Sequence, residues 1–522
     1  MTGFSRSGRA LALALFLSTV AGCDRNPLAG TGGGSGTAEL NPASISASAL
    51  RAAVTDDNVR SFYEAGQWQA VWDDDRAAEL LEAIDQVAAH GLRRDLFIKG
   101  EASEPAAREV QLTKAALGYA KALAMGHVDP KKTVEVYTLA RPKVDVAAGL
   151  RKALADGNVG QWFASLPPQT PEYRALSEAF VRYAKQAEQE KGGAIAVGDA
   201  LKPGQSDPRI PRIAEALASN GYLPPAPAPQ DGQPQAAPSQ RYSPDLVTAV
   251  KRLQTDYGMK ADGVVGPATL EVLNTSAADR ARQLAVNLER LRWLEREPAA
   301  TRIDVNTAAT FLDYWRDGQR RDRRAVVVGQ PDWETPQLGS PIYRLVANPT
   351  WTVPESIYED ELADKGPGYF AANNMVMKNG RVVQQPGPKN SLGEVKLDML
   401  NDEAIYLHDT PAKALFGQPE RHKSHGCVRV HNAVQFARMI AGDEGVLEDF
   451  DEALAKGDEA FVDIKRRIPV RLLYHTAYFD GGRVHFRSDA YGWDENVAVG
   501  LGLVRRVLPT RRPHERGSDF GP

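Results

Sequence analysis

Cysteine is scarce in this chain. Only two cysteines, Cys23 and Cys427, occur among its 522 residues. Cys23 ends an apolar leader, so once it is modified Cys427 has no partner within the chain, and disulfides are not expected to stabilise the fold. Core packing must do so instead, and a hydrophobic content of 43% is enough for globular domains. The length predicts roughly three domains.

An excess of charge of one sign is also absent. The 63 basic and 67 acidic residues give a formal net charge of -4, whereas a general nucleic-acid binder carries a basic patch or stripe. The one basic run, Arg505 to Arg516, lies among prolines and glycine near the C-terminus. We therefore expect no nucleic-acid partner, and we interpret 500–522 as a disordered, solvated tail.

Long apolar runs are missing beyond the first residues. Arg6 and Arg9 precede a short apolar run, Ala10 to Leu17, and small residues follow it. This is the pattern of an export signal, which we place at 1–22. No other window approaches the roughly 20 apolar residues of a membrane span. The body of the protein is therefore expected to be soluble and outside the cytoplasm.

The end of the leader, Val20 to Cys23, resembles the bacterial lipoprotein signal. The resemblance implies cleavage before Cys23 and diacylation of its sulfur, which would anchor the protein to a membrane. Asp24 resembles an inner-membrane retention signal, but that rule varies, so inner and outer membrane both stay open. An ordinary signal peptide with a chance cysteine is the alternative. The glycine-rich stretch within 23–46 indicates a flexible tether.

The first folded region, 47–200, has helical periodicity and is expected to be a scaffold. Asp75 is expected to cap a helix that ends at Gly91. Four aromatic residues cluster just before that helix; they could form a sugar-stacking platform, but core packing is the preferred interpretation because large aromatics dominate small cores. These residues are Phe62, Tyr63, Trp68 and Trp72.

A second unit is expected at 208–274, interrupted by a proline-rich insert at 224–240. Short amphipathic helices flank the insert, and a glycine-containing turn opens a further helix. The unit resembles the peptidoglycan-binding domain of bacterial wall enzymes, which implies association with the wall; actual glycan binding stays open, because such modules also serve as spacers. The motif consists of Ala249-Val250, Leu253-Gln254, Gly258 and Asp262 to Thr269.

At about residue 300 the sequence pattern changes from helical periodicity to short β-rich runs. We expect a compact all-β domain at 300–495, with its chemistry on strand ends and loops, and a cap-like segment within it at about 348–379. The β-rich runs are Val326 to Val328, Tyr343 to Val346, Val382-Val383, Val395 to Leu397 and Ile405 to Leu407.

The candidate chemistry lies between Tyr406 and His431. A thiol is an effective nucleophile as a thiolate, so Cys427 needs a base, and His408 follows an apolar run that could present it from a strand. Gly426 permits a tight backbone that would expose the sulfur and direct amide N–H groups at an oxyanion. Arg429 offers a cationic fork for a substrate carboxylate.

A zinc site is the alternative use of these side chains. The possible ligands are His408, His422, His425, Cys427 and His431. Their spacing matches no standard ligand pairing, and the sequence contains no HExxH. We therefore expect thiol chemistry without a metal or an organic cofactor, and we assign His422 and His431 to surface or loop positions.

Three motifs together resemble the catalytic domain of the L,D-transpeptidases: Tyr406 to Pro411, Ser424 to Val430 and Pro386 to Gly393. The match is closest to the large Gram-negative branch, in which a helical scaffold and a peptidoglycan-binding domain precede the catalytic domain. The resemblance implies a multidomain α+β fold: a β-rich catalytic domain after an α-helical scaffold and a small helical peptidoglycan-binding domain.

The same resemblance implies the roles of the site residues. Cys427 would be the nucleophile and His408 the general base, held by a backbone carbonyl near Asp409. Backbone N–H groups of the Gly426-Cys427 turn would form the oxyanion hole, and Arg429 would orient the substrate. Further substrate-binding residues are expected to be Ser424, His425, Tyr406, Asn390 and Trp351.

The implied substrate is a peptidoglycan stem tetrapeptide. Cys427 would form a thioester with release of D-alanine, and a neighbouring stem would resolve it into a 3-3 cross-link. Carbapenem acylation, a monomeric state and a lipid-anchored, periplasmic location in a Gram-negative bacterium are further expectations. Water or a lipoprotein lysine as acceptor would instead make an L,D-carboxypeptidase or a protein-anchoring enzyme. A non-catalytic wall-binding lipoprotein is the alternative from another class.

Overall fold

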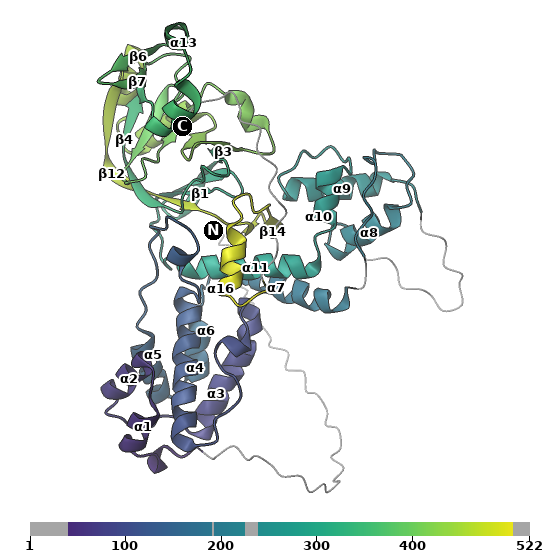
Figure 1. The fold of residues 1–522 in the computed structure, drawn as a ribbon, viewed down its shortest axis with the longest axis vertical. Coiled ribbons are helices and arrows are strands. Elements are labelled where there is room, and N and C mark those ends of the chain that lie inside the picture. The colour runs from purple at the N-terminus through teal and green to yellow at the C-terminus, as the bar shows by residue number, and fades with distance from the viewer. Residues whose placement is uncertain (1–39, 191–192, 225–238, 505–522) are drawn as a thin grey trace, which may run out of the picture.

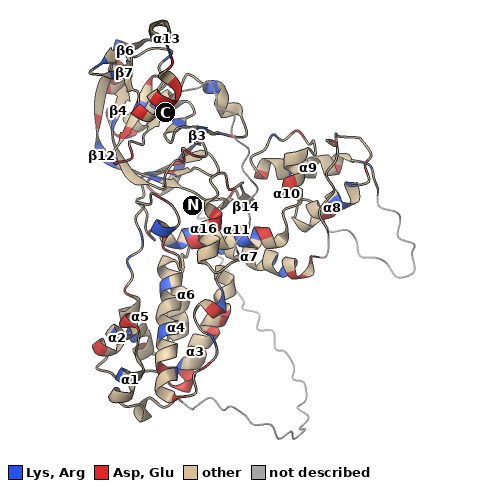
Figure 2. Ribbon diagram, in the orientation of Figure 1, with Lys and Arg blue, Asp and Glu red and all other residues tan. Residues whose placement is uncertain are grey.

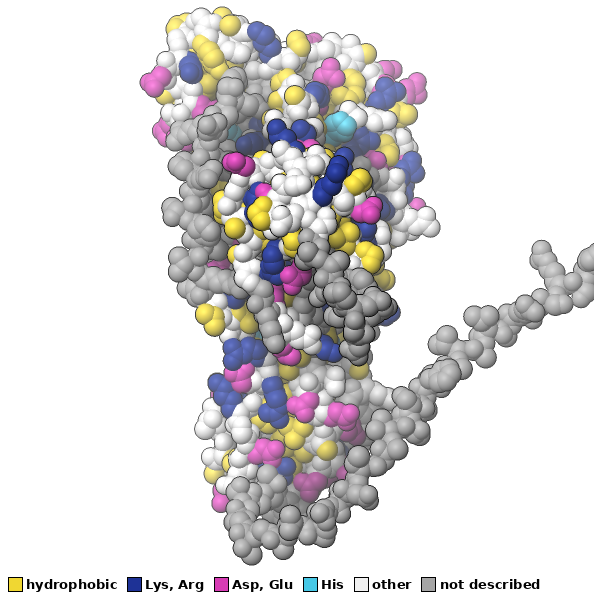
Figure 3. Space-filling model, turned by 90° about the vertical axis from the view of Figure 1, so that its right-hand side faces the viewer, with side chains coloured by type: hydrophobic (Ala, Val, Ile, Leu, Met, Phe, Trp, Pro, Cys, Tyr) yellow, Lys and Arg dark blue, Asp and Glu magenta, His cyan; other side chains and the backbone are white. Residues whose placement is uncertain are grey.

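The computed structural model describes residues 40–190, 193–224 and 239–504 (Figure 1). The expected signal at 1–22, the lipidation site Cys23, and most of the tether, the insert and the tail lie outside the described residues. No helix in the described part is both long and apolar enough to cross a membrane. On the face shown in Figure 3, acidic and basic side chains are interspersed.

The N-terminal region is helical, as predicted. Its long helix α4 (Pro105–Met125) is buried on most sides, and the other elements pack around it (Figure 1). Asp73 rather than Asp75 caps α3, because the Asp73 side chain accepts the Arg76 N–H. The other elements are η1 (Pro42–Ser44), α1 (Ala47–Ala53), α2 (Asp57–Ala65), α3 (Asp74–Asp85), η2 (Gln86–His90), η3 (Arg94–Leu96), η4 (Pro130–Lys132), α5 (Val146–Asp156) and α6 (Val159–Ser165).

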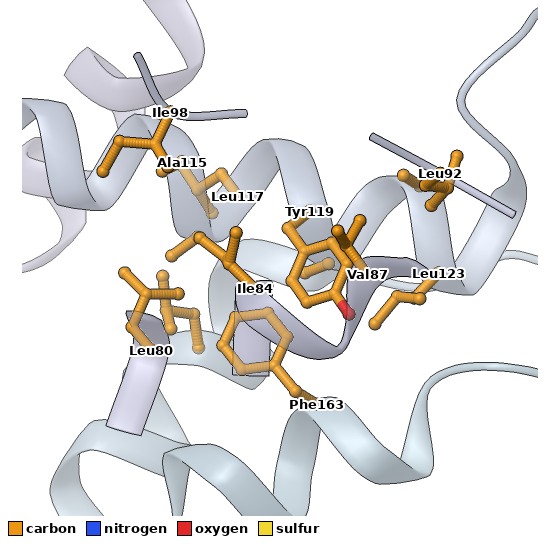
Figure 4. Packing of buried hydrophobic residues seen from close by; sticks show 14 of the residues in the cluster. Leu80, Ile84, Val87, Leu92, Ile98, Ala115, Leu117, Tyr119, Leu123 and Phe163 are labelled. Carbon is orange, nitrogen blue, oxygen red and sulfur yellow. The ribbon is translucent and has the colours of Figure 1, made fainter. Parts of the chain in front are cut away.

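The aromatic cluster before α3 belongs to the core of this region, as predicted. Phe62, Tyr63 and Trp72 are at most 1% exposed and Trp68 is 9% exposed. The Tyr63 hydroxyl and the Trp72 indole N–H both contact the Thr113 hydroxyl, at 2.7 and 2.8 Å. Figure 4 shows the adjoining part of the same core, where Leu80 and Ile84 of α3 meet residues of α4.

A small helical module follows, with α8 (Ile210–Ser219), α9 (Pro244–Asp256) and α10 (Pro267–Leu273) around its own apolar core. Its predicted turn is built by the motif residues. The Gln254 side chain accepts the Gly263 N–H at 2.8 Å and donates to the Val264 carbonyl at 3.0 Å. Gly263 has a φ of +75°, a conformation that glycine adopts without steric cost.

Two helices connect the parts of the molecule. Helix α11 (Ala277–Trp293) packs against α7 (Pro171–Gln189), against the N-terminal core and against the C-terminal helix α16 (Trp493–Gly500). Its charged residues are visible in Figure 2. Several of them are nevertheless fully buried, and Glu289 is paired with Arg292 at 2.6 Å. Sequence analysis assigned no role to α11, because buried ion pairs make a central helix look like a surface helix.

The C-terminal region is built on a nine-stranded sheet of order β10-β3-β11-β9-β8-β4-β12-β1-β2. The long strand β3 also pairs with β2, so the sheet curls and closes on itself. The predicted β-rich runs lie in or directly before its strands or in the cap. The strands are β1 (Arg302–Asn306), β2 (Phe311–Arg316), β3 (Gln319–Gly329), β4 (Gly339–Ala347), β8 (Val395–Met399), β9 (Leu407–His408), β10 (His422–Ser424), β11 (Val428–Val430) and β12 (Ala460–Leu473).

A cap with its own small core stands on this sheet. Its three-stranded sheet has the order β5-β7-β6, and Trp351, Ile357, Leu362 and Met375 are among its buried residues. The cap elements are β5 (Trp351–Thr352), α12 (Glu355–Ile357), a π-helical turn η5 (Tyr358–Leu362), α13 (Pro367–Ala372), β6 (Met375–Lys378) and β7 (Arg381–Gln384). The remaining elements are η6 (Lys413–Gly417), α14 (Ala433–Asp443), α15 (Leu447–Lys456), β13 (Ala477–Asp480) and β14 (Arg483–Phe486).

Candidate active site

The two central motifs lie on neighbouring strands. Strands β9 and β11 pair in parallel, with Leu407 opposite Val428 and His408 opposite Arg429. Leu407 and Val428 belong to the buried core of the sheet. Because side chains alternate along a strand, His408 and Arg429 share the opposite face. Cys427 immediately precedes β11, so the candidate nucleophile adjoins the strand that pairs with the one carrying His408, nineteen positions earlier in the sequence.

Cys427 is buried, with 4% of its surface exposed, and the expectation of an exposed sulfur is wrong. Its thiol donates to the Ala404 carbonyl at 3.7 Å and is hydrogen-bonded to the Tyr406 side chain. Burial raises the pKa of the Cys427 thiol to about 11, while the positive charges of Lys396 and Arg429 act in the opposite direction. The thiol is therefore protonated at neutral pH and requires a base.

His408 lies in β9 and is fully buried. Its ring meets the Tyr406 ring edge-on, with the centroids 5.6 Å apart. Strand β9 pairs with β11, the strand that follows Cys427. The role of His408 as the general base stays a prediction.

The nucleophile loop, Ser424 to Cys427, is held by two hydroxyl groups. Ser424 Oγ donates to the Cys427 carbonyl at 2.6 Å and accepts the Gly426 N–H at 3.3 Å. Thr335 Oγ1 donates to the Gly426 carbonyl at 2.8 Å. Gly426 has a φ of +110°, so a side chain there would be strained. The Gly426 N–H, predicted to help form the oxyanion hole, thus bonds within the loop in this conformation.

His425 connects the nucleophile loop to the cap. Its Nε2 lies 2.9 Å from Glu361 Oε1 in η5, and its ring packs edge-on against Trp333 at 4.9 Å. The side chain is only 7% exposed. His425, which was expected to bind substrate or shape the loop, therefore fastens the cap over the loop in this structure.

A polar cluster on β8 was not predicted from the sequence. Lys396 Nζ lies 4.2 Å from the centre of the Tyr406 ring and 2.8 Å from Asp398 Oδ1. Asp398 also accepts a hydrogen bond from Arg344 at 2.6 Å. Lys396 stands opposite His408 in the register of β8 and β9. The available signal was the alternation of polar residues within the apolar run from Val395 to Met399.

Asp409 organises the segment beside the base. Its carboxylate accepts the Glu394 N–H at 3.1 Å and contacts the Lys413 ammonium group. A Cβ on Gly393 would collide with this carboxylate, which explains a glycine at that position. The predicted role of a backbone carbonyl near Asp409 in orienting His408 is not tested by these contacts.

Trp351 and Asn390 are predicted substrate-binding residues that are buried, as are Ser424 and Arg429 at 0% exposed. Trp351 is 2% exposed and packs in the cap core. Asn390 is 1% exposed, and its side-chain amide donates to the carbonyls of Pro349, Gln384 and Gln385. Both side chains shape the base of the cap in this structure, and their contact with substrate stays a prediction.

His431 and His422, the other two histidines of the candidate region, differ in exposure. His431 is exposed, as expected. His422 is 3% exposed, so its assignment to the surface is wrong: it lies in β10, contacts Glu420 and bonds to the Thr307 carbonyl at 3.0 Å. Within the described residues, no group of three or more His, Cys, Asp or Glu residues could hold a metal ion.

Comparison with known proteins agrees with this geometry. Residues 300–462, which include Cys427 and His408, match the family model of the L,D-transpeptidase catalytic domain. The chain carries an L,D-transpeptidase catalytic domain. Residues 57–180 match a scaffold domain, and residues 206–273 match a domain described as "Putative peptidoglycan binding domain". A β-rich transpeptidase domain thus follows a helical scaffold and a small helical module, which confirms the predicted fold class.

A curated protein of Haemophilus influenzae, described as "Putative L,D-transpeptidase", is 30% identical to this chain over 254 residues. The match covers 44% of this chain and 52% of the relative, so the chain spans about half the length of that protein. Crystal structures of L,D-transpeptidases from Stackebrandtia nassauensis and Xylanimonas cellulosilytica are 14% and 13% identical. They cover 56% and 53% of this chain and 100% and 98% of their own, with TM-scores of 0.22 and 0.18.

Proposed function

We propose that the protein is a peptidoglycan L,D-transpeptidase that forms 3-3 cross-links through a thioester on Cys427. The proposal is supported by the pairing of β9, which carries His408, with β11, the strand directly after Cys427, and by the charges of Lys396 and Arg429, which act to lower the thiol pKa. A buried, protonated thiol is suited to a reaction in which a base, here proposed to be His408, acts only after the substrate has arrived.

In the first half-reaction, the Cys427 thiol gives its proton to His408. The sulfur then attacks the carbonyl carbon of the third residue of a stem tetrapeptide. The tetrahedral intermediate collapses, the amide bond to the terminal D-alanine breaks, and His408 protonates the departing amine. D-Alanine leaves, and the third residue is held as a thioester. Arg429 would orient the stem through a carboxylate, and backbone N–H groups of the nucleophile loop would stabilise the oxyanion.

In the second half-reaction, the side-chain amine of a third residue on another stem attacks the thioester. A carbon–nitrogen bond forms, the carbon–sulfur bond breaks, and the amine's proton returns to the sulfur by way of His408. Water as the acceptor would release a tripeptide, and a protein lysine would attach that protein to the wall. The three outcomes share the acyl-enzyme, and the three-domain organisation favours the stem as acceptor.

The same thioester chemistry supports reaction with carbapenems. Their strained ring carbonyl would be attacked by Cys427 in place of the stem carbonyl, and the opened ring would remain attached to sulfur. Incubation with a carbapenem should therefore add one antibiotic mass to Cys427. An unmodified Cys427 after prolonged incubation would contradict this part of the proposal.

The proposed setting is the cell envelope. The helical module at 206–273 would hold the enzyme at the wall, and a lipid on Cys23 would anchor it to a periplasmic membrane surface as a monomer. Metabolic labelling with a fatty acid, compared between the natural chain and Cys23→Ala, tests the anchor. Loss of the label in Cys23→Ala is expected, and equal labelling of both chains would reject it.

The decisive experiment is intact-mass spectrometry of the full chain incubated with a disaccharide tetrapeptide, beside the Cys427→Ala variant. A thioester adduct on Cys427, released D-alanine and a 3-3 dimer are expected. An adduct that resolves only to tripeptide would support the carboxypeptidase instead. No adduct and no turnover would reject the enzyme and favour a wall-binding protein. Any shortened chain should retain Leu40, which is 3% exposed and packs in the scaffold core.

A further inference from the structure

A cavity of about 700 Å³ lies where the helical module, α11 and the transpeptidase domain meet. Module residues from Tyr257 to Thr275 line one side, and residues 279–286 of α11 form part of another. Residues 308–310 and 419–422 contribute from the closed sheet, and residues 487–489 from the segment after β14. Neither Cys427 nor His408 is among the lining residues, so this cavity is separate from the candidate active site.

Within 40–190, 193–224 and 239–504, no carboxylate lies within salt-bridge distance of two arginines in this cavity. Arg421 donates to the carbonyls of Thr310, Val326 and Gln418, at 2.9 to 3.2 Å. Arg487 donates through Nη1 to the carbonyls of Asp256 and Phe486. Of the five N–H groups of a guanidinium, these bonds leave two on Arg421 and three on Arg487. Carbonyl dipoles hold both groups in place without neutralising their charge.

The pKa shifts of the two arginines also indicate a site that favours an anion. Burial lowers the pKa of both guanidinium groups, and the neighbouring charge of Arg487 lowers the pKa of Arg421 further. The nearby Asp256 carboxylate is bonded to Arg483 at 2.8 Å. An anion placed between Arg421 and Arg487 would relieve this repulsion and accept charge-assisted hydrogen bonds, which are the stronger kind.

Most acidic residues in the cavity already have partners. Glu495 is paired with Arg282 at 2.7 Å, and Asp494 with Arg290. Glu420 contacts His422. Asp489 accepts the Tyr474 hydroxyl, and burial raises the pKa of its carboxyl to about 7. Arginines thus offset the charges of Glu495 and Asp494, and the raised pKa of Asp489 favours its neutral form. Glu420 stays ionised, because burial raises its pKa but the His422 contact lowers it to about 2, and it is the acidic group that acts on Arg421.

We propose that this cavity is a second binding site, in which Arg421 and Arg487 hold a carboxylate of a peptidoglycan stem peptide. The ligand class rests on the proposed function, because a stem peptide is the carboxylate-bearing polymer segment that such an enzyme meets. The site would hold one strand of the wall next to the catalytic domain: Arg421 precedes β10, and β10 leads directly to Ser424 of the nucleophile loop.

The test is photo-cross-linking of the full chain carrying Cys427→Ala, which prevents turnover. The probe is a disaccharide tetrapeptide with a photoreactive group at its reducing end, and cross-linked peptides are mapped by mass spectrometry. Cross-links to 257–275 or 419–422 are expected, in addition to those around position 427. Labelling confined to the active site would overturn the proposal.

Two changes separate binding from folding. The double variant Arg421→Gln/Arg487→Gln should reduce cavity labelling about 10-fold or more, since it removes charge-assisted bonds. Arg487 also contacts the module, so Ala268→Trp provides a second variant that fills the cavity and leaves both arginines in place. It should reduce labelling similarly. Arg252→Gln removes an exposed arginine of the same module outside the cavity and should change nothing. Undiminished labelling in both cavity variants would reject the site.

The chemical source of the anion is tested with two competitors. A probe whose carboxylates are converted to amides should lose cavity labelling, whereas millimolar inorganic phosphate should compete weakly. Equal labelling by the amidated probe, or full displacement by phosphate, would overturn the assignment to stem carboxylates. Acylation of the natural chain is measured in parallel by intact mass. Acylated Cys427 without cavity labelling would reject this inference alone, and cavity labelling without acylation would reject the proposed function alone.

Discussion

The two ends of the segment from Arg421 to Cys427 have opposite electrostatic designs. At the Cys427 end, a thiol is buried in the sheet core and kept neutral, although the charges of Lys396 and Arg429 favour its charged form. At the Arg421 end, two cations remain charged beside an open cavity. The closed end suits a reaction in which charge appears only in the presence of substrate, and the open end suits binding of a charge that is already there.

The largest effect is expected from removal of the Cys427 sulfur. Cys427→Ala should abolish thioester formation, with a loss of turnover of at least about 10⁴-fold, because the nucleophile itself is gone. The buried sulfur packs in the sheet core, so a loss of stability of about 1 kcal/mol is expected as well. Intact mass and thermal unfolding measure the two effects. Residual turnover close to that of the natural chain would show that Cys427 is not the nucleophile.

The next largest effect is expected from the base. His408→Ala should slow acylation about 10²- to 10⁴-fold, since a thiol with a pKa of about 11 cannot ionise unaided at neutral pH. His425→Ala, which removes a histidine of the same loop region, should cost much less. Stopped acylation reactions followed by mass spectrometry give both rates. Equal losses in the two variants would require a new assignment of the base.

A smaller effect is expected from Lys396, whose charge favours the thiolate. Lys396→Met removes that charge, so the thiol pKa should rise above about 11 and acylation should slow less than about 10-fold. The measurement is the pH dependence of the alkylation of Cys427 in both proteins. For the natural chain, the rate should increase through pH 9 to 11, and for the variant the curve should move to higher pH. An unchanged curve would show that Lys396 does not act on the thiol.

The pH dependence of stability follows from the same pKa. The unfolded thiol has the ordinary value of 9.0 and the folded thiol a value of about 11. Between these values the folded state keeps a proton that the unfolded state loses. The stabilisation of the folded state that results from this raised pKa is therefore present below about pH 9 and is lost as the pH rises through about 11. The difference in unfolding free energy between the natural chain and Cys427→Ala should follow that window.

Much of this organisation could be predicted from the sequence. Apolar β-rich runs predicted strands such as β3 and β4, because they fill both faces of a buried sheet. The motif around Cys427 predicted the parts of the site that are local in sequence. The rest depends on contacts between distant segments. Thr335 reaches the nucleophile loop from the segment between β3 and β4, and Lys396 lies on β8. Periodicity cannot report contacts between segments so far apart in the chain.

Helix α11 illustrates the same limit. Its charges predict an exposed helix when read alone, yet Arg290 reaches Asp494 on α16, more than 200 positions later. Burial of His422 has the same origin, since its partner carbonyl belongs to Thr307. Because of such pairings, charged residues of the core resemble surface residues in the sequence, and only the tertiary structure reveals their burial.

The smallest effect is expected from the contact that closes the cap. Glu361→Gln keeps the size of the side chain but removes the charge that faces His425 at 2.9 Å. A partly exposed pair of this kind contributes on the order of 1 kcal/mol at most, so the cap should open several times more often while the rest of the domain keeps its stability. Hydrogen exchange should accelerate in 355–372 and stay unchanged in β4. Glu359→Gln, which changes an exposed residue two positions earlier in η5, is the matched control. Faster exchange in both variants, or in neither, would show that the His425 contact does not hold the cap closed over the nucleophile loop.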